Sequence, residues 1–321
     1  MVAIVADDPK IEKEIQSLLD ILVNAGCGFH SKLVIHEKGG GLSIKTAEPM
    51  EYGKEIIRLP RTVLMPSDQY TLDINGKNFV VGYPESSIAT GLQRRVIDKM
   101  YEIYNLTNKV ELHEQYSFLF SLKSIPSLID KLAEGREFIT GPYKDWLSWI
   151  KTGMTDVQRR KILFETYVKT RPLGYSDHVR ESSVSMIMPV LDFMNHHWEG
   201  GAFAVGQGGM RKGDLVMHNS QPFKDSTECY ANYGIMDAFD SLVRYDFIDK
   251  TSPIVRSVSI DLEGPAGDKI QIQNKLSFSY SKDLEKEMQD LRRHIPDISF
   301  KDNQMVVSHV LLPVGQSKFA L

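Results

Sequence analysis

Polar residues that could bind a ligand interrupt an apolar run at residues 188–197. The run contains Asp192 and ends in Asn195, His196 and His197. A carboxylate, an amide and imidazoles are costly to bury unless they are hydrogen-bonded. Either the fold or a ligand must therefore satisfy them, and both readings stay open: a binding site, or polar core residues that cap a turn.

A second block with chemical potential, residues 228–234, is rich in tyrosine and is followed by Tyr245 and Phe247. Tyrosine combines an apolar ring with one polar tip. Buried polar groups that converge with aromatic rings are what a small-molecule site needs. The two blocks together therefore indicate a ligand pocket, provided that the fold brings them side by side.

Metal and thiol chemistry are the alternatives for these blocks. Asp192, His196 and His197 could supply two imidazoles and one carboxylate to an iron oxygenase. Adjacent histidines on an extended segment point to opposite faces, however, which disfavours one shared metal. We therefore expect no metal site, and His197 is expected at the surface or behind the site. Cys229 has no evident histidine partner and is expected to pack in the core.

Composition bounds the protein class. The chain has 321 residues, 42% of them apolar and 25% charged, with a net charge of -4. Such a chain can form one large domain or two modest ones. The charge disfavours nucleic acid as a partner. Two cysteines cannot build a disulfide framework or a cysteine-rich zinc site, which favours a reducing compartment.

The sequence also predicts a cytoplasmic protein that does not span a membrane. The N-terminus lacks the basic region and the long apolar core of a secretory signal. No apolar run reaches the length of about 20 residues that a bilayer requires.

Residues 1–86 read as one helix followed by short strands. The helix begins after Asp8 and ends at Gly26, with apolar residues on one face. Glycines at 39–41 permit a positive φ, which suits a hairpin turn or a close backbone approach to a ligand. Asn75-Gly76 suits a tight turn. The predicted strands are 32–36, 43–46, 54–59, 70–74 and 78–81.

Helical spacing replaces this pattern at residues 87–169, and short strands return at 202–205 and 215–218. The tail alternates around Ile260 and Leu262 and closes with one strand at 305–312. Between them, one helix is predicted with an apolar face of Leu284, Met288, Leu291 and Ile295. Strands, then helices, then strands indicate an α+β fold rather than alternating βαβ units.

Taken in order, the motifs resemble those of SET-domain protein methyltransferases, most closely the class of the Rubisco large-subunit lysine methyltransferase. The resemblance covers roughly residues 10–250. The matching motifs are Gly39-Gly40-Gly41-Leu42, the helical insert, Thr170-Arg171, Asp192-Phe193-Met194-Asn195-His196, Tyr233-Gly234 and Tyr245-Asp246-Phe247. The resemblance implies a SET fold, in which small β-sheets surround a pseudoknot. The implied parts are a SET N-terminal part at 1–86, a helical insert at 87–169, a SET C-terminal part at 170–250 and a small β/α extension at 251–321.

The resemblance also implies the cofactor S-adenosylmethionine and a protein substrate with a lysine acceptor. The residues implied for the cofactor are Lys38, Gly39 and Gly40 through their backbone, Arg171 at its carboxylate, Asn195 and His196 at its adenine and amino groups, and Phe247 near its adenine. Asp192 and Tyr245 would face the acceptor channel, with Tyr233 as the catalytic tyrosine.

These residue types suit methyl transfer. The reaction is an in-line displacement, so positioning is most of the task. The lysine acceptor must lose its proton, and a dry aromatic channel favours the neutral amine. Tyr233 follows a strand-like run and precedes Gly234, which allows a close turn beside a ligand.

The sequence departs from the family pattern at three places. Lys38 and Gly40 stand where relatives often have an acidic and a larger residue, and Asp246 replaces the glycine of Tyr-Gly-Phe. The asparagine expected after Tyr-Gly is replaced near Asp237. These departures leave a second reading open, a catalytically weak SET-like module that binds a partner protein.

Overall fold

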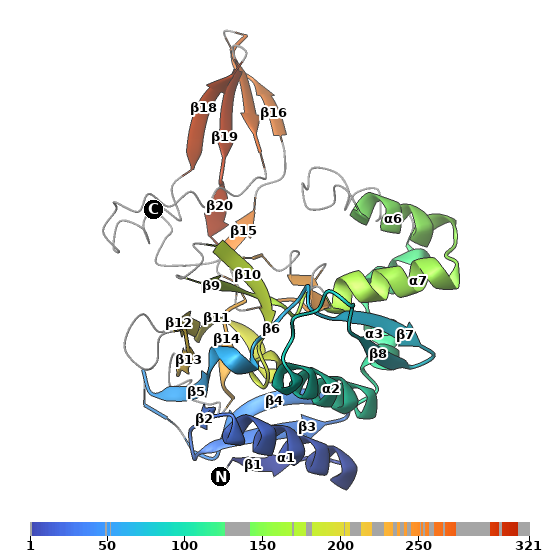
Figure 1. Cartoon of the computed structure of the whole chain (residues 1–321). Helices are drawn as coiled ribbons and strands as arrows, with labels where there is room; N and C mark the ends of the chain where they lie inside the picture. Colours follow the sequence, from blue (N-terminus) through green and yellow to red (C-terminus); the bar gives the residue numbers. More distant parts are fainter. Residues whose placement is uncertain are drawn as a thin grey trace. The chain divides into compact units, whose positions relative to one another are not determined.

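The structure is a computed structural model (Figure 1). It describes residues 2–48, 50–51, 53–125, 142–168, 170–177, 182–201, 203–205, 213–219, 228–233, 236–237, 241–242, 245–250, 252, 254–256, 260–265, 267–273, 296–301 and 304–313. Helices and small sheets both contribute, which confirms the predicted α+β class. The chain divides into two compact units, the first with Met1–Ser117 and Arg159–Gly234 and the second with Phe118–Gln158 and Ile235–Leu321.

Helix α1 (Pro9–Asn24) begins and ends where the sequence predicts. The Asp8 carboxylate accepts a hydrogen bond from Lys10 N at 2.8 Å, and Pro9 occupies the first turn. Its apolar face is buried in the first unit, with Ile15, Leu18 and Leu22 fully inaccessible. Gly26 follows the end of the helix with φ +87°.

The β3–β4 hairpin of the first unit carries the glycine turn. Strand β3 (Leu33–Lys38) pairs antiparallel with β4 (Gly41–Thr46), and β1 (Ala3–Val5) lies parallel to β3. Lys38 is paired with Gly41, so the loop consists of two residues, Gly39 and Gly40. Both have positive φ, at 56° and 83°, as a type I′ turn requires.

Four further small sheets complete the first unit. One has the order β12-β13-β5-β2 and another the order β6-β10-β9. Two-stranded sheets are formed by β11 with β14 and by β7 with β8. The bounds are β2 Gly28–Phe29, β5 Glu55–Leu59, η1 Arg61–Val63, β6 Met65–Pro66, β7 Thr71–Asn75, β8 Asn78–Gly82, β9 Leu173–Asp177, β10 Ser182–Ile187, η5 Leu191–Phe193, β11 Asn195–Gly201, β12 Phe203–Val205, β13 Leu215–His218 and β14 Tyr230–Ala231.

The β7–β8 hairpin corrects one predicted turn. Asn75 pairs with Asn78, so the two loop residues are Gly76 and Lys77 rather than Asn75 and Gly76. Gly76 has φ +60°, the conformation that the first position of the turn demands.

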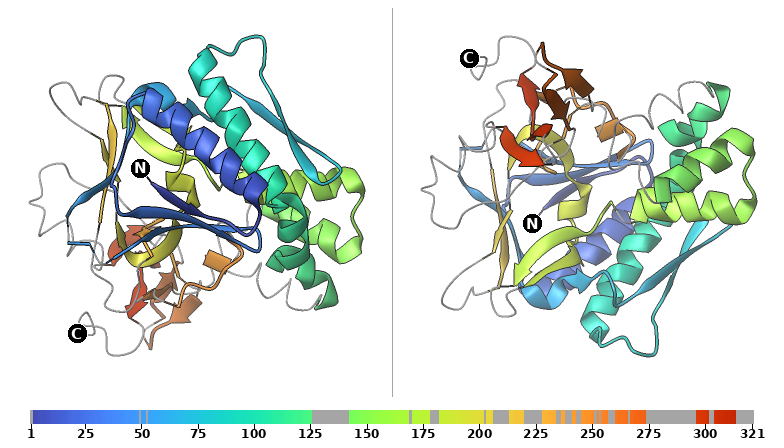
Figure 2. Two further views of the ribbon diagram at one scale, coloured as in Figure 1. Left: turned by 90° about the horizontal axis from the view of Figure 1, so that it is seen from below. Right: turned by 90° about the horizontal axis from the view of Figure 1, so that it is seen from above.

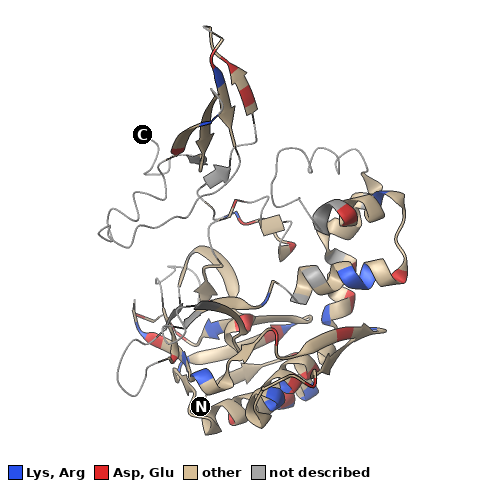
Figure 3. Cartoon of the chain, turned by 45° about the horizontal axis from the view of Figure 1, so that its top comes forward, with Lys and Arg blue, Asp and Glu red and all other residues tan. Residues whose placement is uncertain are grey.

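All the regular secondary structure that the structure describes within the predicted insert, residues 87–169, is helical. Helix α2 (Gly91–Leu106) starts at a capping box formed by Thr90 and Gln93, and it packs beside α1 (Figure 2). Lysine, arginine, aspartate and glutamate are interspersed over these helices (Figure 3). The other helical segments are α3 Lys109–Tyr116, α4 Phe118–Ser121, η2 Leu122–Ser124, α6 Pro142–Thr152, α7 Asp156–Leu163 and the π-helix η4 Phe164–Val168. Its boundaries as a separate domain remain a prediction.

The second unit contains a four-stranded sheet with the order β16-β17-β19-β18 and a pair formed by β15 and β20. The bounds are β15 Ile254–Arg256, β16 Ile260–Glu263, β17 Lys269–Ile272, β18 Asp297–Lys301, β19 Gln304–Ser308 and β20 Leu311–Pro313. The prediction of one closing strand at 305–312 is wrong, because His309 has φ +57° and separates β19 from β20. The predicted helix with Leu284 lies outside the described residues.

None of the helices in the described ranges combines the length and the apolar character that a membrane crossing needs.

Candidate functional site

Strands β11 and β14 bring the two polar blocks of the sequence together. They pair in parallel, with Asn195 opposite Tyr230 and His196 opposite Ala231. Asn195 is exposed and His196 is half-buried. Asn195, His196 and His197 therefore lie on β11, beside the strand that Tyr233 follows by two residues, while Asp192 precedes β11 in η5.

His196 and Tyr233 are in direct contact. The Tyr233 N–H donates a hydrogen bond to Nδ1 of His196 at 3.0 Å, and the ring centroids are 5.1 Å apart. An Nδ1 that accepts a hydrogen bond leaves the proton of a neutral imidazole on Nε2. The Tyr233 hydroxyl donates to the carbonyl of Met194, which holds the ring in place.

Glu228 ties Asn195 to the β3–β4 hairpin. Asn195 Nδ2 donates to Glu228 Oε1 at 2.6 Å, and Glu228 forms an isolated β-bridge with Lys45 of β4. The next residue, Cys229, donates its N–H to Ile44 at 2.8 Å. Burial raises the pKa of the Cys229 thiol to about 12, so this residue packs as the sequence predicts and is a poor nucleophile.

The glycine turn has its own carboxylate partners. Gly39 N–H donates to Asp7 Oδ2 at 2.9 Å, and Gly40 N–H donates to Glu37 Oε1 at 2.7 Å. A Cβ on Gly40 would lie 2.7 Å from the carbonyl oxygen of Thr107, so the turn packs tightly against the end of α2. The sequence analysis expects this backbone to contact a cofactor, but the N–H groups of Gly39 and Gly40 already donate to Asp7 and Glu37.

Arg171 and Asp192 form an ion pair with a distance of 3.0 Å between Nη1 and Oδ2. The side chains are 23% and 9% exposed. Asp192 also accepts a hydrogen bond from the hydroxyl of Tyr104 on α2. Two residues that the sequence analysis assigns to different ligand groups are therefore partners of each other.

Aromatic rings enclose this ion pair. The guanidinium carbon of Arg171 lies 4.0 Å from the ring centroid of Tyr167 and 5.2 Å from that of Tyr104. In the described part of the chain, Arg171 Nε and the Tyr167 hydroxyl are buried without a hydrogen-bond partner. Burial, with the negative charge of Asp192 acting in the same direction, raises the pKa of Tyr104 well above its ordinary value.

Two basic groups on α3, Lys109 and His113, have lowered pKa values. Burial lowers the pKa of Lys109 to about 8; the charge of Arg171 adds to this effect, and Asp192 and Glu37 oppose it. Burial and the same arginine lower the pKa of His113 to about 4. His113 Nε2 lies 2.8 Å from Oγ1 of Thr166.

The remaining predicted site residues, Tyr245 and Phe247, belong to the second unit. Their ring centroids are 6.1 Å apart, and the carboxylate of Asp246 between them accepts a hydrogen bond from Phe118 N at 3.1 Å. Lys38 ends β3, and Gly234 lies outside the described residues. His197 is half-buried, with its ring 5.3 Å from that of Tyr230.

Tyr104, Lys109 and Glu37 are site residues that the sequence analysis does not identify. Tyr104 lies on the buried face of α2, which contains Tyr101 as well. Two tyrosines on one buried helix face need hydrogen-bond partners, and that requirement was the available signal. In the described ranges, no group of three or more His, Cys, Asp or Glu side chains is arranged to hold a metal ion.

No family model and no curated protein matches the sequence. Among solved structures, the chain is similar to the SET domain of LSMT bound to lysine and AdoHcy, with 12% identity and a TM-score of 0.41 over 79% of this chain. The same domain bound to methyl-lysine and AdoHcy has 12% identity and a TM-score of 0.42 over 79% of this chain. Rubisco LSMT bound to AdoMet has 12% identity and a TM-score of 0.38 over 78% of this chain. The chain spans 61%, 61% and 59% of those three structures.

Proposed function

We propose that the protein is an S-adenosylmethionine-dependent methyltransferase that acts on a lysine side chain of a protein substrate. The observation that carries the proposal is the parallel pairing of β11 with β14. It places Asn195 and His196 beside the strand that leads to Tyr233, with His196 bonded to the backbone of that tyrosine. These are the motifs whose order in the sequence resembles the SET family.

The residues of the first unit suit such a cofactor in their donor chemistry. Arg171 keeps one buried donor, Nε, without a partner among the described residues, and a guanidinium is the natural partner of a carboxylate. His196 with a proton on Nε2 and the amide of Asn195 offer donors and acceptors that suit an adenine. When bound, the cofactor supplies the methyl group.

The role of the chain in the transfer is to hold the acceptor. The phenol oxygen of Tyr233 donates to the Met194 carbonyl and can accept a hydrogen bond from the acceptor amine at the same time. Its ring is fixed by His196, so the hydroxyl need not be reoriented during the reaction. Asp192 and Tyr245 remain proposed residues of the acceptor channel.

A second candidate is a SET-like protein-binding module with little or no transfer activity. The bonds of the glycine turn favour it, because the N–H groups of Gly39 and Gly40 are already satisfied by Asp7 and Glu37. Arg171 is also paired, with Asp192. Cofactor binding would have to exchange or supplement these contacts.

The experiment that tests the proposal is incubation of the purified protein with radiolabelled S-adenosylmethionine and a host-cell lysate, with Tyr233→Phe as the control. The proposal expects labelled lysine in at least one lysate protein, with the label reduced by the variant. If wild type and Tyr233→Phe both transfer no label, the protein-binding module is the better account. If both transfer label equally, Tyr233 is not the catalytic tyrosine.

A further inference from the structure

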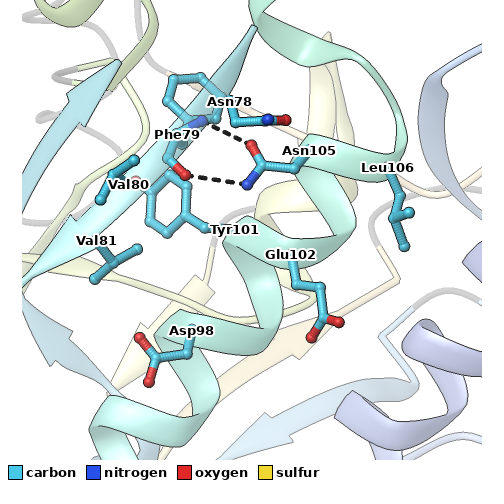
Figure 4. A pocket seen from close by; sticks show the side chains of 9 residues that line it. All are labelled: Asn78, Phe79, Val80, Val81, Asp98, Tyr101, Glu102, Asn105 and Leu106. Carbon is cyan, nitrogen blue, oxygen red and sulfur yellow. Dashed lines mark hydrogen bonds between the residues drawn. The ribbon is translucent and has the colours of Figure 1, made fainter. Parts of the chain in front are cut away.

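A groove lies between strand β8 and helix α2 in the first unit, and none of the residues that line it belongs to the proposed methyl-transfer site (Figure 4). Its volume is about 470 Å³. Phe79 and Tyr101 form its buried floor, 5% and 2% exposed, with their ring centroids 5.5 Å apart in an edge-to-face arrangement. Asp98 and Glu102, one helical turn apart, are both exposed and line the same groove.

Strand β8 presents an edge to this groove. The hairpin closes at the Asn75–Asn78 pair, and hydrogen-bonded and non-hydrogen-bonded pairs alternate from there along the ladder. The backbone N–H and C=O of Val80 therefore point toward β7, whereas those of Phe79 and Val81 point outward. The side chain of Asn105 confirms this for Phe79, since its Oδ1 accepts from Phe79 N at 2.7 Å and its Nδ2 donates to Phe79 O at 3.0 Å (Figure 4).

Asn105 thus imitates one residue of a neighbouring strand. Two residues further along the same edge, Val81 lines the groove, and no other described residue hydrogen-bonds to its N–H or C=O. An open sheet edge beside a groove is the feature that extended peptides use when they add a strand to a sheet. The edge at Val81 therefore has room and hydrogen-bonding capacity for one residue of such a peptide.

The charges on the rim select the kind of peptide. Asp98 Oδ1 accepts from the Tyr83 hydroxyl at 2.7 Å, and Glu102 Oε2 accepts from Lys99 Nζ at 2.6 Å. In the described ranges, Asp98 Oδ2 and Glu102 Oε1 have no such partner. Lys99 is itself shared with Glu14 at 2.5 Å, so its charge is balanced elsewhere. The rim is therefore net acidic.

An aliphatic stem with a cationic end fits both parts of this groove. The stem of a lysine or arginine packs on the half-buried apolar side chains that line the groove, Val81 and Leu106, while its charge reaches the two carboxylates. An acidic or a purely apolar side chain would leave these carboxylates uncompensated. Charge and edge geometry therefore point to the same ligand class.

We propose that this groove binds an extended peptide segment that carries lysine or arginine, with its backbone paired to Val81 and its basic side chain between Asp98 and Glu102. The proposal concerns binding alone, and it holds whether or not the protein transfers methyl groups.

The test uses blocked six-residue peptides in fluorescence anisotropy titrations with the full chain. The first alternates valine with lysine, the second alternates valine with glutamate, and the third repeats the first with methylated backbone nitrogens. We expect saturable binding of the lysine peptide, and binding at least about tenfold weaker for each of the other two. In nuclear magnetic resonance spectra, the Val81 amide should shift on titration with the lysine peptide.

Variants locate the binding. Asp98→Asn combined with Glu102→Gln should weaken binding of the lysine peptide by about five- to tenfold, since each exposed charge pair contributes little alone. Glu12→Gln, an exposed position on α1, removes a charge without touching the groove and should leave binding unchanged. Equal loss in both variants would show that only the overall charge matters and would overturn the proposal. So would spermine competing as well as the peptide, or the methylated peptide binding as tightly as the unmethylated one.

Discussion

Arg171 and Asp192, 21 residues apart in the sequence, meet as an ion pair at 3.0 Å inside a shell of tyrosine rings. Arg171 stacks on Tyr167, and Asp192 accepts a hydrogen bond from the hydroxyl of Tyr104. The pair connects the end of the helical segment to the 3-10 turn that precedes Asn195. Any ligand that binds Arg171 must therefore bind a guanidinium whose charge Asp192 already balances.

Removal of Asp192 should be strongly destabilising. Asp192→Ala leaves the guanidinium of Arg171 buried without its counter-charge, and we expect a loss of about 3–5 kcal/mol in the free energy of unfolding. Urea denaturation measures it. Lys77→Ala is the matched control, because it breaks an exposed pair with Glu111 at 2.9 Å and should cost less than about 1 kcal/mol. Similar losses in both variants would contradict the buried character of the Arg171–Asp192 pair.

The two glycines of the β3–β4 turn should differ in their tolerance of alanine. In Gly39→Ala the new Cβ has no atom within 4 Å, so only the positive φ is unfavourable, and the free energy of unfolding should fall by about 1–2 kcal/mol. Gly40→Ala adds a clash with Thr107 O at 2.7 Å and Leu112 Cδ1 at 2.5 Å, for a total of roughly 2–4 kcal/mol. Thermal unfolding of the two variants compares them. Equal melting temperatures would show that the turn does not pack against α2.

Lys109 should make stability depend on pH. Its pKa is about 8 in the folded protein against 10.5 for an ordinary lysine, so the unfolded chain binds more protons between these values. Stability should therefore rise with pH in this window because of Lys109. In Lys109→Met this contribution disappears, and the difference between the two unfolding profiles isolates it from the tyrosines. Parallel profiles from pH 7 to pH 10.5 would show that Lys109 is not perturbed.

Much of the local structure follows from spacing along the chain. The stripe from Ile11 to Leu22 predicts α1 correctly, because a helix face repeats every three to four residues whatever its neighbours are. The strands of the β3–β4 hairpin are predicted because short runs typical of strands flank the glycine turn. The break at His309 is not, since a positive φ at a residue other than glycine has no pattern in the sequence.

The candidate site is predictable only in part. The sequence singles out Asn195 and His196 as candidates because polar residues stand out in an apolar run, and it singles out Tyr233 through the Tyr-Gly motif that resembles the SET family. Which residues satisfy them is decided by pairing between distant segments, and spacing does not encode it. Tyr104 shows this most clearly. In the sequence it is one more core aromatic of α2, and only the fold shows that it bonds to Asp192, 88 residues away.

Tyr233→Phe should separate catalysis from stability. The change leaves the Met194 carbonyl without its donor, for about 1–2 kcal/mol of stability. The rate of methyl transfer should fall by about 100-fold, as expected for the loss of one positioned polar group. Single-turnover transfer to a labelled acceptor measures the rate. Tyr230→Phe, three residues earlier in β14, is the control and should transfer at the wild-type rate. A slow Tyr230→Phe with a normal Tyr233→Phe would reverse the assignment.

The most direct test of the proposed function is calorimetric titration of the protein with S-adenosylmethionine and with its demethylated product. We expect saturable binding of both, and about tenfold weaker binding by Asn195→Ala, since the adenine would lose one hydrogen-bonding partner. Glu228→Gln keeps an acceptor for Asn195 and should bind nearly as wild type does. Absence of heat with the wild-type protein at about millimolar ligand, a concentration at which even a weak complex forms, would contradict the proposal that this protein is a methyltransferase.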